Sequence, residues 1–314
     1  MTEQRPTVSV IIPAHNSSRF IKKTIESVIN QTYEDWELVV VDDGSQDNTE
    51  EIVRSLCVTN KRIKYFSQDN FGAPSRPTNR GIREGRGDYI AILQHDDEWL
   101  PEKLEKQIIL MNTATGKDAD FIGCDAFIVN DTKKSEARSI LCVPERREDF
   151  LYALLSSNIL PYPSAMLIRK RVFENFGYFD EEFNMADDWE MWIRLAAQGV
   201  SFASIHEPLF KYHIHGTNIT KTIATGKMIK DLEYLAIKHE SLYSRYPRAR
   251  SRMMAYLGKL YADDGELTRA QSILKQAIVL DRANWKAYVT LLISSLGIKT
   301  YRRAASAIKF FRGS

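Results

Sequence analysis

The sequence predicts an α/β protein with a mostly parallel central sheet flanked by helices, followed by an α-helical C-terminal extension. Three observations support this prediction. Continuous apolar runs rich in β-branched residues, such as VSVIIP at 8–13, are typical of strands that are covered on both faces. Such runs alternate with segments of helical periodicity through the first half of the chain. From about residue 225 helix formers dominate and the β-branched runs disappear.

Strands and helices are expected to follow one another in order along the first half. Ser17 or Ser18 can cap the first helix, in which Ile21 and Ile25 lie on one side at helical spacing. Pro101 suits the first turn of the helix after the fourth strand. The expected strands are 8–13, 37–43, 62–67, 89–93 and 120–129. Besides the first helix, helices are expected near 49–56, 75–85 and 101–111.

Polar clusters follow four of these strands at the points where the strands end. Ligands of such sheets bind outside the carboxyl ends of the strands, which meet at one edge. We therefore expect the four clusters to form a single binding site. They are Pro13–Asn16, Asp42–Ser45, Gln68–Asn70 and Gln94–Glu98.

The last of these clusters concentrates acidic groups behind a buried strand. Clustered carboxylates are costly to desolvate and raise one another's pKa, and a divalent cation removes both problems. Asp96 and Asp97, with His95 beside them, offer ligands suited to Mg²⁺ or Mn²⁺. The alternative is a solvated acidic turn in which Asp97 or Glu98 caps the next helix. The spacing alone leaves both interpretations open, and the polar ends of the other strands favour the cation.

Two aspartates close the second strand. A carboxylate of Asp42 or Asp43 can accept a hydrogen bond from the N3–H of a pyrimidine base or from a ribose hydroxyl. The alternative is an Asx turn with a helix cap, which accounts for Asp47 and Asn48 more readily than for both strand-end aspartates.

A second acidic cluster lies far along the chain. Trp189 and Trp192 follow helical spacing, so that a helix begins near Asp188, with Asp187 at its mouth. These acids are either helix caps or the source of a general base. Further on come His213 and His215, each of which is a structural residue or a neutral ligand that completes a metal site.

The composition limits the classes of function. The chain has 43 basic and 41 acidic residues, a net charge of +2, which argues against a nucleic-acid partner. Cys57, Cys124 and Cys142 are widely spaced and are expected to be free thiols in a reducing compartment. The N-terminus shows no signal peptide, and no apolar run approaches the roughly 20 residues that span a bilayer. We expect a cytoplasmic protein, with contact to the inner membrane face left open.

The C-terminal region is expected to form a separate helical extension. We predict domains at 1–224 and 225–314. Residues 255–292 resemble a tetratricopeptide-like repeat, with small or apolar residues at the repeat's positions: Gly258, Tyr261, Gly265, Ala270, Ala277 and Leu280. So short an array must dock on the main domain, pair with another chain or cap a partner. The final segment, 300–314, is a basic amphipathic helix that touches anionic lipid or is an ordinary terminal helix.

The ordered set of motifs resembles the family-two inverting glycosyltransferases of GT-A fold. The motifs are VSVIIPAHN, VVVDDGSQDNT, DNFG with NRGI, AILQHDDEWLP, GYFDEEFNMADDWEMW and YHIHG, and the resemblance covers about residues 6–220. It implies transfer of a sugar from a nucleotide sugar, expected to be a UDP-sugar, with a divalent metal, Mn²⁺ or Mg²⁺. The acceptor would be a glycan, lipid-linked or protein hydroxyl in cell-surface polysaccharide, lipopolysaccharide or glycan synthesis.

The resemblance also implies roles for single residues. Asp188 would be the catalytic base, and Asp96 would hold the metal and diphosphate, with His215 as a further contact. Gln94, His95, Asp97 and Asp187 would support these groups. The donor nucleotide would be bound by Pro13, His15, Asn16, Asp42, Asp43, Asn70 and Arg80.

The chain departs from the family pattern at three positions. Gln94 stands where the family has the first aspartate of its Asp-x-Asp motif, so that one charge is missing. Pro77–Asn79 replaces an Ala-Arg-Asn sequence, and Asp187 replaces a glutamate. The substitution at Gln94 supports an alternative function, a non-catalytic nucleotide-binding scaffold whose helical tail binds a partner. A nucleotidyltransferase and a dinucleotide oxidoreductase are disfavoured because their glycine-rich loops are absent.

Overall fold

The computed structural model describes residues 6–113, 118–131, 135–140, 144, 146–216 and 225–303. Cys142 and the end of the terminal segment, 304–314, lie outside these residues. The chain divides into two compact units, one formed by Met1–Val143 with Leu160–Thr222 and the other by Pro144–Ile159 with Ile223–Ser314. The second unit thus includes a segment, 144–159, that the sequence analysis placed in the first domain.

The first unit is built on one mixed sheet. Its described strands follow the order β3-β2-β1-β4-β8-β6-β9-β5, and β7 pairs with β6. β1 to β4 run parallel, β8 is antiparallel to both of its neighbours, and β9 runs parallel to β6. The strands are β1 Val8–Ala14, β2 Trp36–Asp43, β3 Ile63–Gln68, β4 Tyr89–Ile92, β5 Glu98–Trp99, β6 Phe121–Asn130, β7 Ser135–Ser139, β8 Leu167–Arg169 and β9 Phe202–Ile214.

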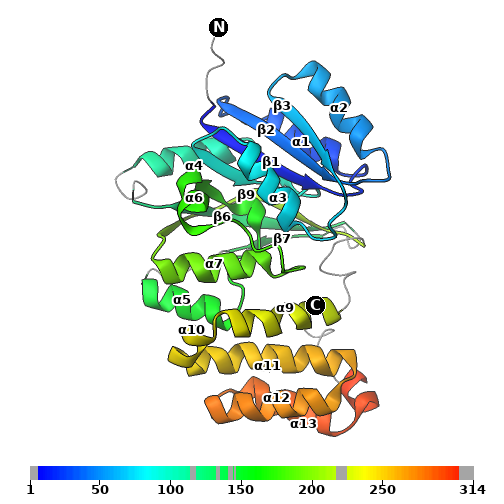
Figure 1. The fold of residues 1–314 in the computed structure, drawn as a ribbon, viewed down its shortest axis with the longest axis vertical. Helices are drawn as coiled ribbons and strands as arrows, with labels where there is room; N and C mark the ends of the chain where they lie inside the picture. Colours follow the sequence, from blue (N-terminus) through cyan, green and yellow to red (C-terminus); the bar gives the residue numbers. More distant parts are fainter. Residues whose placement is uncertain are drawn as a thin grey trace. The chain divides into compact units, whose positions relative to one another are not determined.

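The first four strands and their helices confirm the predicted mostly parallel α/β architecture (Figure 1). β1 and β2 are buried along their whole length, as expected of continuous apolar runs. α3 packs closely on them because of Gly81, where an added Cβ would lie 2.3 Å from a methyl carbon of Ile11. The helices of this unit are α1 Ile21–Ile29, α2 Thr49–Thr59, α3 Ser75–Glu84, α4 Lys103–Asn112, α6 Lys170–Phe176 and α7 Asp187–Gln198.

The predicted cap of the first helix is wrong. α1 begins at Ile21 after Phe20, which makes no side-chain cap hydrogen bond. The hydroxyl of Ser17 instead accepts from the His15 N–H, and the Ser18 N–H donates to Asp47. Both serines hold the loop that precedes the helix.

The second unit is helical, as predicted for the C-terminal region. In Figure 1 α11 lies between α9 and α12, and α13 packs beside α12. The close approach of α11 to α12 depends on Gly258, where an added Cβ would lie 2.7 Å from a side-chain carbon of Leu274. The helices are α5 Arg147–Ser156, α9 Thr225–Lys238, α10 Glu240–Arg245, α11 Pro247–Asp264, α12 Leu267–Leu280 and α13 Trp285–Ser295. No described helix is both long and apolar enough to cross a membrane.

Candidate active site

A cavity of about 160 Å³ in the first unit brings the two acidic clusters together. Asp96 and Asp97 line it after β4, and Asp187 and Asp188 line it from the start of α7. Segments about ninety residues apart thus share one space. Of the four strand-end clusters, Gln94–Glu98 contributes lining residues, and the other three are not among the described residues that line the cavity. The other lining residues are Pro74, Thr78, Ile92, Gln94, His95, Pro161, Tyr162, Pro163, Phe179, Asn184, Met185 and Tyr212.

The turn after β4 sends its two aspartates into different surroundings. Asp97 is 1% exposed, and its carboxylate accepts hydrogen bonds from the Ser164 hydroxyl and, at 3.4 Å, from the His213 N–H. Burial, together with the nearby charge of Asp96, raises the pKa of Asp97 well above its usual value. Asp97 therefore shapes the turn, whereas Asp96 lines the cavity and is less buried.

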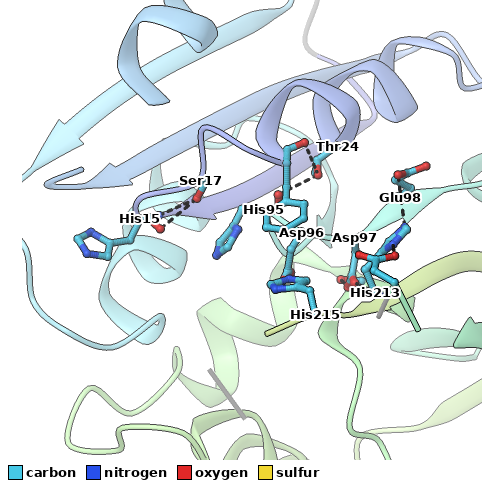
Figure 2. Close-up of polar contacts among 12 residues, drawn as sticks. His15, Ser17, Thr24, His95, Asp96, Asp97, Glu98, His213 and His215 are labelled. Carbon is cyan, nitrogen blue, oxygen red and sulfur yellow. Dashed lines mark hydrogen bonds and ion pairs between the residues drawn. The ribbon is translucent and has the colours of Figure 1, made fainter. Parts of the chain in front are cut away.

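Asp96 contacts a histidine from the end of β9. Its Oδ2 lies 3.0 Å from Nε2 of His215 (Figure 2). The His215 ring stacks on Phe20 with a centroid distance of 4.3 Å. The side chain of His215 is 3% exposed and that of Asp96 is 14% exposed. The stacked ring holds Nε2 toward the carboxylate.

The pair fits a divalent cation as two of its ligands. An imidazole nitrogen and a carboxylate oxygen are both ligands of Mn²⁺, and two adjacent ligands about 2.1 Å from an octahedral ion lie about 3 Å apart. The described residues hold no group of three or more histidine, cysteine, aspartate or glutamate side chains suited to a metal.

The other two histidines near the turn have different surroundings (Figure 2). His213 Nδ1 lies 3.1 Å from Asp131 Oδ1, and its Nε2 lies 3.3 Å from Glu98 Oε1. The structure therefore pairs His215, and not His213, with Asp96. His95 holds α1 through its carbonyl, which accepts from Thr24, while its Nδ1 is buried and has no hydrogen-bond partner among the described residues. Burial lowers the pKa of His95, so that its ring is neutral at pH 7.

The late acidic cluster sits on a firmly packed helix end. α7 begins at Asp187, which confirms the predicted start near Asp188. Negative charge is favourable in the first turn of a helix. Trp189 and Trp192 are buried behind it, and the indole N–H of Trp192 donates to the Leu160 carbonyl at 3.1 Å. Asp188 is half-buried and lines the cavity, and its Oδ1 accepts a hydrogen bond from the Trp189 N–H at 2.6 Å.

The strand-end aspartates of β2 organise the neighbouring loops. Asp42 accepts from the Ser45 N–H at one oxygen and from the Tyr65 hydroxyl at the other, both at 2.8 Å. Asp43 accepts from the side chain of Gln68 at 2.7 Å and from the Phe71 N–H at 2.9 Å. Both carboxylates are buried and fix the shape of the edge where a nucleotide is expected.

Asp47 has the local capping role considered in the sequence analysis. Its carboxylate accepts from the Thr49 N–H at 3.1 Å and from the Ser18 N–H at 3.0 Å. Partial burial raises the pKa of Asp47, but hydrogen bonds from Ser18 and Thr49 outweigh it and lower the pKa to about 2.

The loops after β1 and β2 are joined by side-chain hydrogen bonds. The Asn16 N–H donates to the Ser45 hydroxyl, and the Gln46 N–H donates to the Asn16 side chain, both at 2.8 Å. Asn16 adopts a φ of 48°, a left-handed conformation that asparagine tolerates. His15 Nδ1 lies 2.9 Å from the Asp43 carbonyl, and the Asn70 amide lies 3.0 Å from the same ring. Four of the predicted nucleotide-site residues therefore lie together.

Two other predicted nucleotide-site residues lie elsewhere on this edge. Pro13 is buried within β1 opposite Val41, so that it supports the loop from beneath. Arg80 donates to the Ser67 carbonyl at 2.6 Å and lies over the Phe66 ring, at the end of β3.

Sequence reasoning did not identify two residues that hold the site together. Ser164 accepts from the Gln94 N–H, donates to Asp97 and accepts from the Trp99 indole at its carbonyl. Asn79 pairs with the backbone of Phe179, accepting from its N–H at 3.0 Å and donating to its carbonyl at 2.8 Å. Ser164 stands in no quoted motif, and although Asn79 opens the NRGI motif, that motif does not indicate a contact with Phe179.

Comparisons with known proteins identify the family of the chain. The sequence model described as glycosyl transferase family 2 matches residues 9–177. An uncharacterized glycosyltransferase of Rickettsia prowazekii is 33% identical over 224 residues, which cover 69% of this chain and 67% of the relative.

Two solved structures share the fold at low identity. The structure of residues 1–349 of Staphylococcus aureus TarS, in complex with UDP-GlcNAc, has a TM-score of 0.65 and 17% identity, covering 95% of this chain and 92% of that one. The mannosyltransferase PcManGT of Pyrobaculum calidifontis, in complex with GDP-Man and Mn²⁺, has a TM-score of 0.60 and 16% identity, covering 97% and 84%. With the family match over more than half of the chain, they show that this chain belongs to glycosyl transferase family 2 and is a glycosyltransferase of GT-A fold.

Proposed function

We propose that the chain transfers a sugar from a UDP-sugar to a hydroxyl group, with inversion at the anomeric carbon. The observation that carries the proposal is the shared cavity, which both Asp96 and Asp188 line. A group that binds diphosphate and a group that accepts a proton must face the same sugar for direct displacement.

Asp188 is the proposed base. Its carboxylate takes the proton of the acceptor hydroxyl as that oxygen forms a bond to the anomeric carbon. The bond from this carbon to the diphosphate oxygen breaks at the same time, and the nucleoside diphosphate leaves with the electron pair. Attack from the side opposite the leaving group inverts the configuration.

Asp96 and His215 are the proposed protein ligands of Mn²⁺ or Mg²⁺. When bound, the ion neutralises charge that develops on the diphosphate. Gln94 carries no charge, and the Asp97 carboxylate is occupied by hydrogen bonds from the Ser164 hydroxyl and the His213 N–H, so Asp96 is the proposed anionic ligand of the turn. His15, Asn16, Asp43 and Asn70 are the proposed nucleotide contacts, with Asp42 as their support.

The acceptor is proposed to be a glycan or a lipid-linked glycan of cell-surface polysaccharide, lipopolysaccharide or glycan synthesis. Tyr162 and Tyr212 line the cavity, with ring centroids 5.0 Å apart. Aromatic faces pack well against the C–H face of a sugar ring, which supports a sugar acceptor. We propose a cytoplasmic location at the inner membrane face, where such acceptors are assembled.

A donor panel tests the proposal. The full chain is incubated with UDP-, GDP- and dTDP-sugars, with Mn²⁺ or with a chelator, and nucleotide release is measured. We expect release from UDP-sugars with Mn²⁺ and at least a tenfold loss with the chelator. Equal release with and without the ion would remove the metal assignment. No UDP binding in calorimetry would remove the proposed donor class.

A further inference from the structure

The positive charge of the chain is concentrated in the helical unit. Pro144–Ile159 and Ile223–Ser314 contain 19 lysines and arginines against 10 aspartates and glutamates, a formal net charge of +9. The other unit contains 24 basic and 31 acidic residues, a net charge of −7. The total of +2 therefore conceals two oppositely charged units.

α13 exposes a stripe of large apolar side chains within this basic unit. Their spacing of three and four residues places them on one side of the helix. Ala287 and Ser294 are buried on the opposite side. Scattered exposed apolar residues are normal, but a contiguous stripe marks an interaction surface. The stripe consists of Trp285, 62% exposed, Tyr288, 45%, Val289, 40%, Leu292, 66%, and the following Leu296, 62%.

Basic side chains accompany the stripe. Lys286 is exposed on α13 itself, Arg282 is exposed just before the helix and Lys299 just after it. Between Leu267 and Arg303 the chain has seven lysines and arginines and a single acidic residue, Asp281. Tryptophan, tyrosine and leucine beside lysine and arginine are typical of helices that lie in the interface of an anionic bilayer.

We propose that the exposed stripe of α13 docks on the surface of a bilayer that contains anionic phospholipid. Apolar side chains enter the boundary between headgroups and acyl chains while the basic side chains meet lipid phosphates. A second copy of the chain is the less favourable occupant, because its own stripe would bring a like-charged unit to the same face. The residues of this surface take no part in the proposed sugar transfer. A result that contradicts one proposal therefore does not contradict the other.

Vesicle sedimentation tests the surface. The full chain is mixed with phosphatidylcholine vesicles with and without 30% phosphatidylglycerol, and the bound fraction is measured in low and high salt. We expect at least tenfold tighter binding to the anionic vesicles, and weaker binding in high salt. Trp285→Ser with Leu292→Ser is expected to weaken binding at least tenfold, and Arg282→Glu with Lys286→Glu to weaken it at least tenfold.

Matched variants and a second measurement keep the test decisive. Val58 on α2 is 72% exposed, and Val58→Ser is expected to bind vesicles like the wild type. Circular dichroism and thermal unfolding establish that the α13 variants are folded. Equal binding to neutral and anionic vesicles, or no binding to either, would overturn the proposal. The proposal would also be overturned if light scattering showed a dimer of the wild type and the combined Trp285→Ser and Leu292→Ser substitutions dissociated it. UDP-sugar hydrolysis is expected to be unchanged in the α13 variants and tests the proposed function separately.

Discussion

Asp96 and His215 are 119 positions apart in the chain, yet Asp96 Oδ2 lies 3.0 Å from His215 Nε2. The contact joins the turn after β4 to the end of β9. The two residues are not neighbours in the sequence. β9 pairs in parallel with β6, and this pairing brings His215 to the edge of the sheet where Asp96 lies.

His215→Ala is expected to weaken Mn²⁺-dependent UDP binding at least tenfold, because it removes one of two proposed protein ligands. Calorimetry with UDP in the presence and absence of Mn²⁺ measures the effect. His206→Ala, which removes an exposed histidine from the same strand, is the control and should bind like the wild type. Equal metal dependence in the two variants would exclude His215 as a ligand.

Gln94→Asp is expected to raise the apparent Mn²⁺ affinity roughly tenfold, or about 1.4 kcal/mol. The substitution adds a carboxylate beside Asp96 at the cavity. Without metal the added charge is expected to lower the melting temperature, because it faces other carboxylates. The measurement is the thermal shift on adding Mn²⁺, which should be larger for the variant. A smaller shift than in the wild type would show that Gln94 does not face the ion.

Asp188→Asn is expected to lower kcat by about 10²–10⁴-fold, since the amide cannot take the acceptor proton. Binding of the UDP-sugar, measured by calorimetry, should change less than about threefold. Glu182→Gln, at an exposed acid ahead of α7, serves as the control with wild-type kcat. Wild-type turnover by Asp188→Asn would assign the base to another residue.

Asn79→Ala is expected to lower the free energy of unfolding by about 2–4 kcal/mol, because it leaves the buried N–H and carbonyl of Phe179 unpaired. Urea denaturation measures this change. Asn48→Ala removes an exposed asparagine that makes no side-chain cap hydrogen bond and should stay within about 0.5 kcal/mol of the wild type. If Asn79→Ala lowered the free energy of unfolding as little as Asn48→Ala does, the loop at Phe179 would have to repack in the variant.

Lys103 predicts a pH-dependent stability. It is fully buried beneath Trp99, with its ammonium 4.1 Å from the ring centroid and 2.7 Å from Gln107 Oε1. Burial lowers the pKa of Lys103 to about 8, below its usual 10.5. The unfolded chain therefore binds more protons between these values, and the lysine's contribution to stability rises as the pH increases from about 8 to 10.5.

Lys103→Met should be more stable than the wild type below pH 8, and the difference should narrow as the pH rises. The difference in the free energy of unfolding should change by about 3 kcal/mol in all, at 1.36 kcal/mol per pKa unit. The loss of the hydrogen bond to Gln107 reduces the advantage of the variant. Urea denaturation from pH 7 to 10 measures it, with the exposed Lys22→Met as the control. A difference that is constant with pH would contradict the lowered pKa.

The sequence pattern predicted the parallel half of the sheet because each of its strands is a continuous apolar run that can be recognised from neighbouring residues. β1, β2 and β4 are apolar runs that are buried almost throughout, and each was expected within a few residues of its bounds. The polar clusters at the edge of the sheet were predicted from the points where the same strands end. β8 and β9 were not predicted, since β8 has only three residues and β9 is largely half-exposed.

The site could be predicted only where it is carried by motifs. Asp96, Asp188 and His215 each stand in a recognisable segment, and the structure brings the first two to one cavity. Ser164 and Asn79 act through contacts that span 70 and 100 positions, and such contacts depend on how the loops pack. Residue type alone does not reveal them.

The joined loops after β1 and β2 have a consequence for how a nucleotide enters. Asn16, Ser45 and Gln46 already hold one another, and Ser17 donates to Thr49 at 2.8 Å. A donor that binds at the proposed nucleotide site would therefore meet amide and imidazole groups whose freedom is already restricted, and it would lose little entropy of loop ordering on association. Discrimination between bases at the proposed site would then depend on shape and hydrogen-bond pattern and not on a loop that adapts to each ligand.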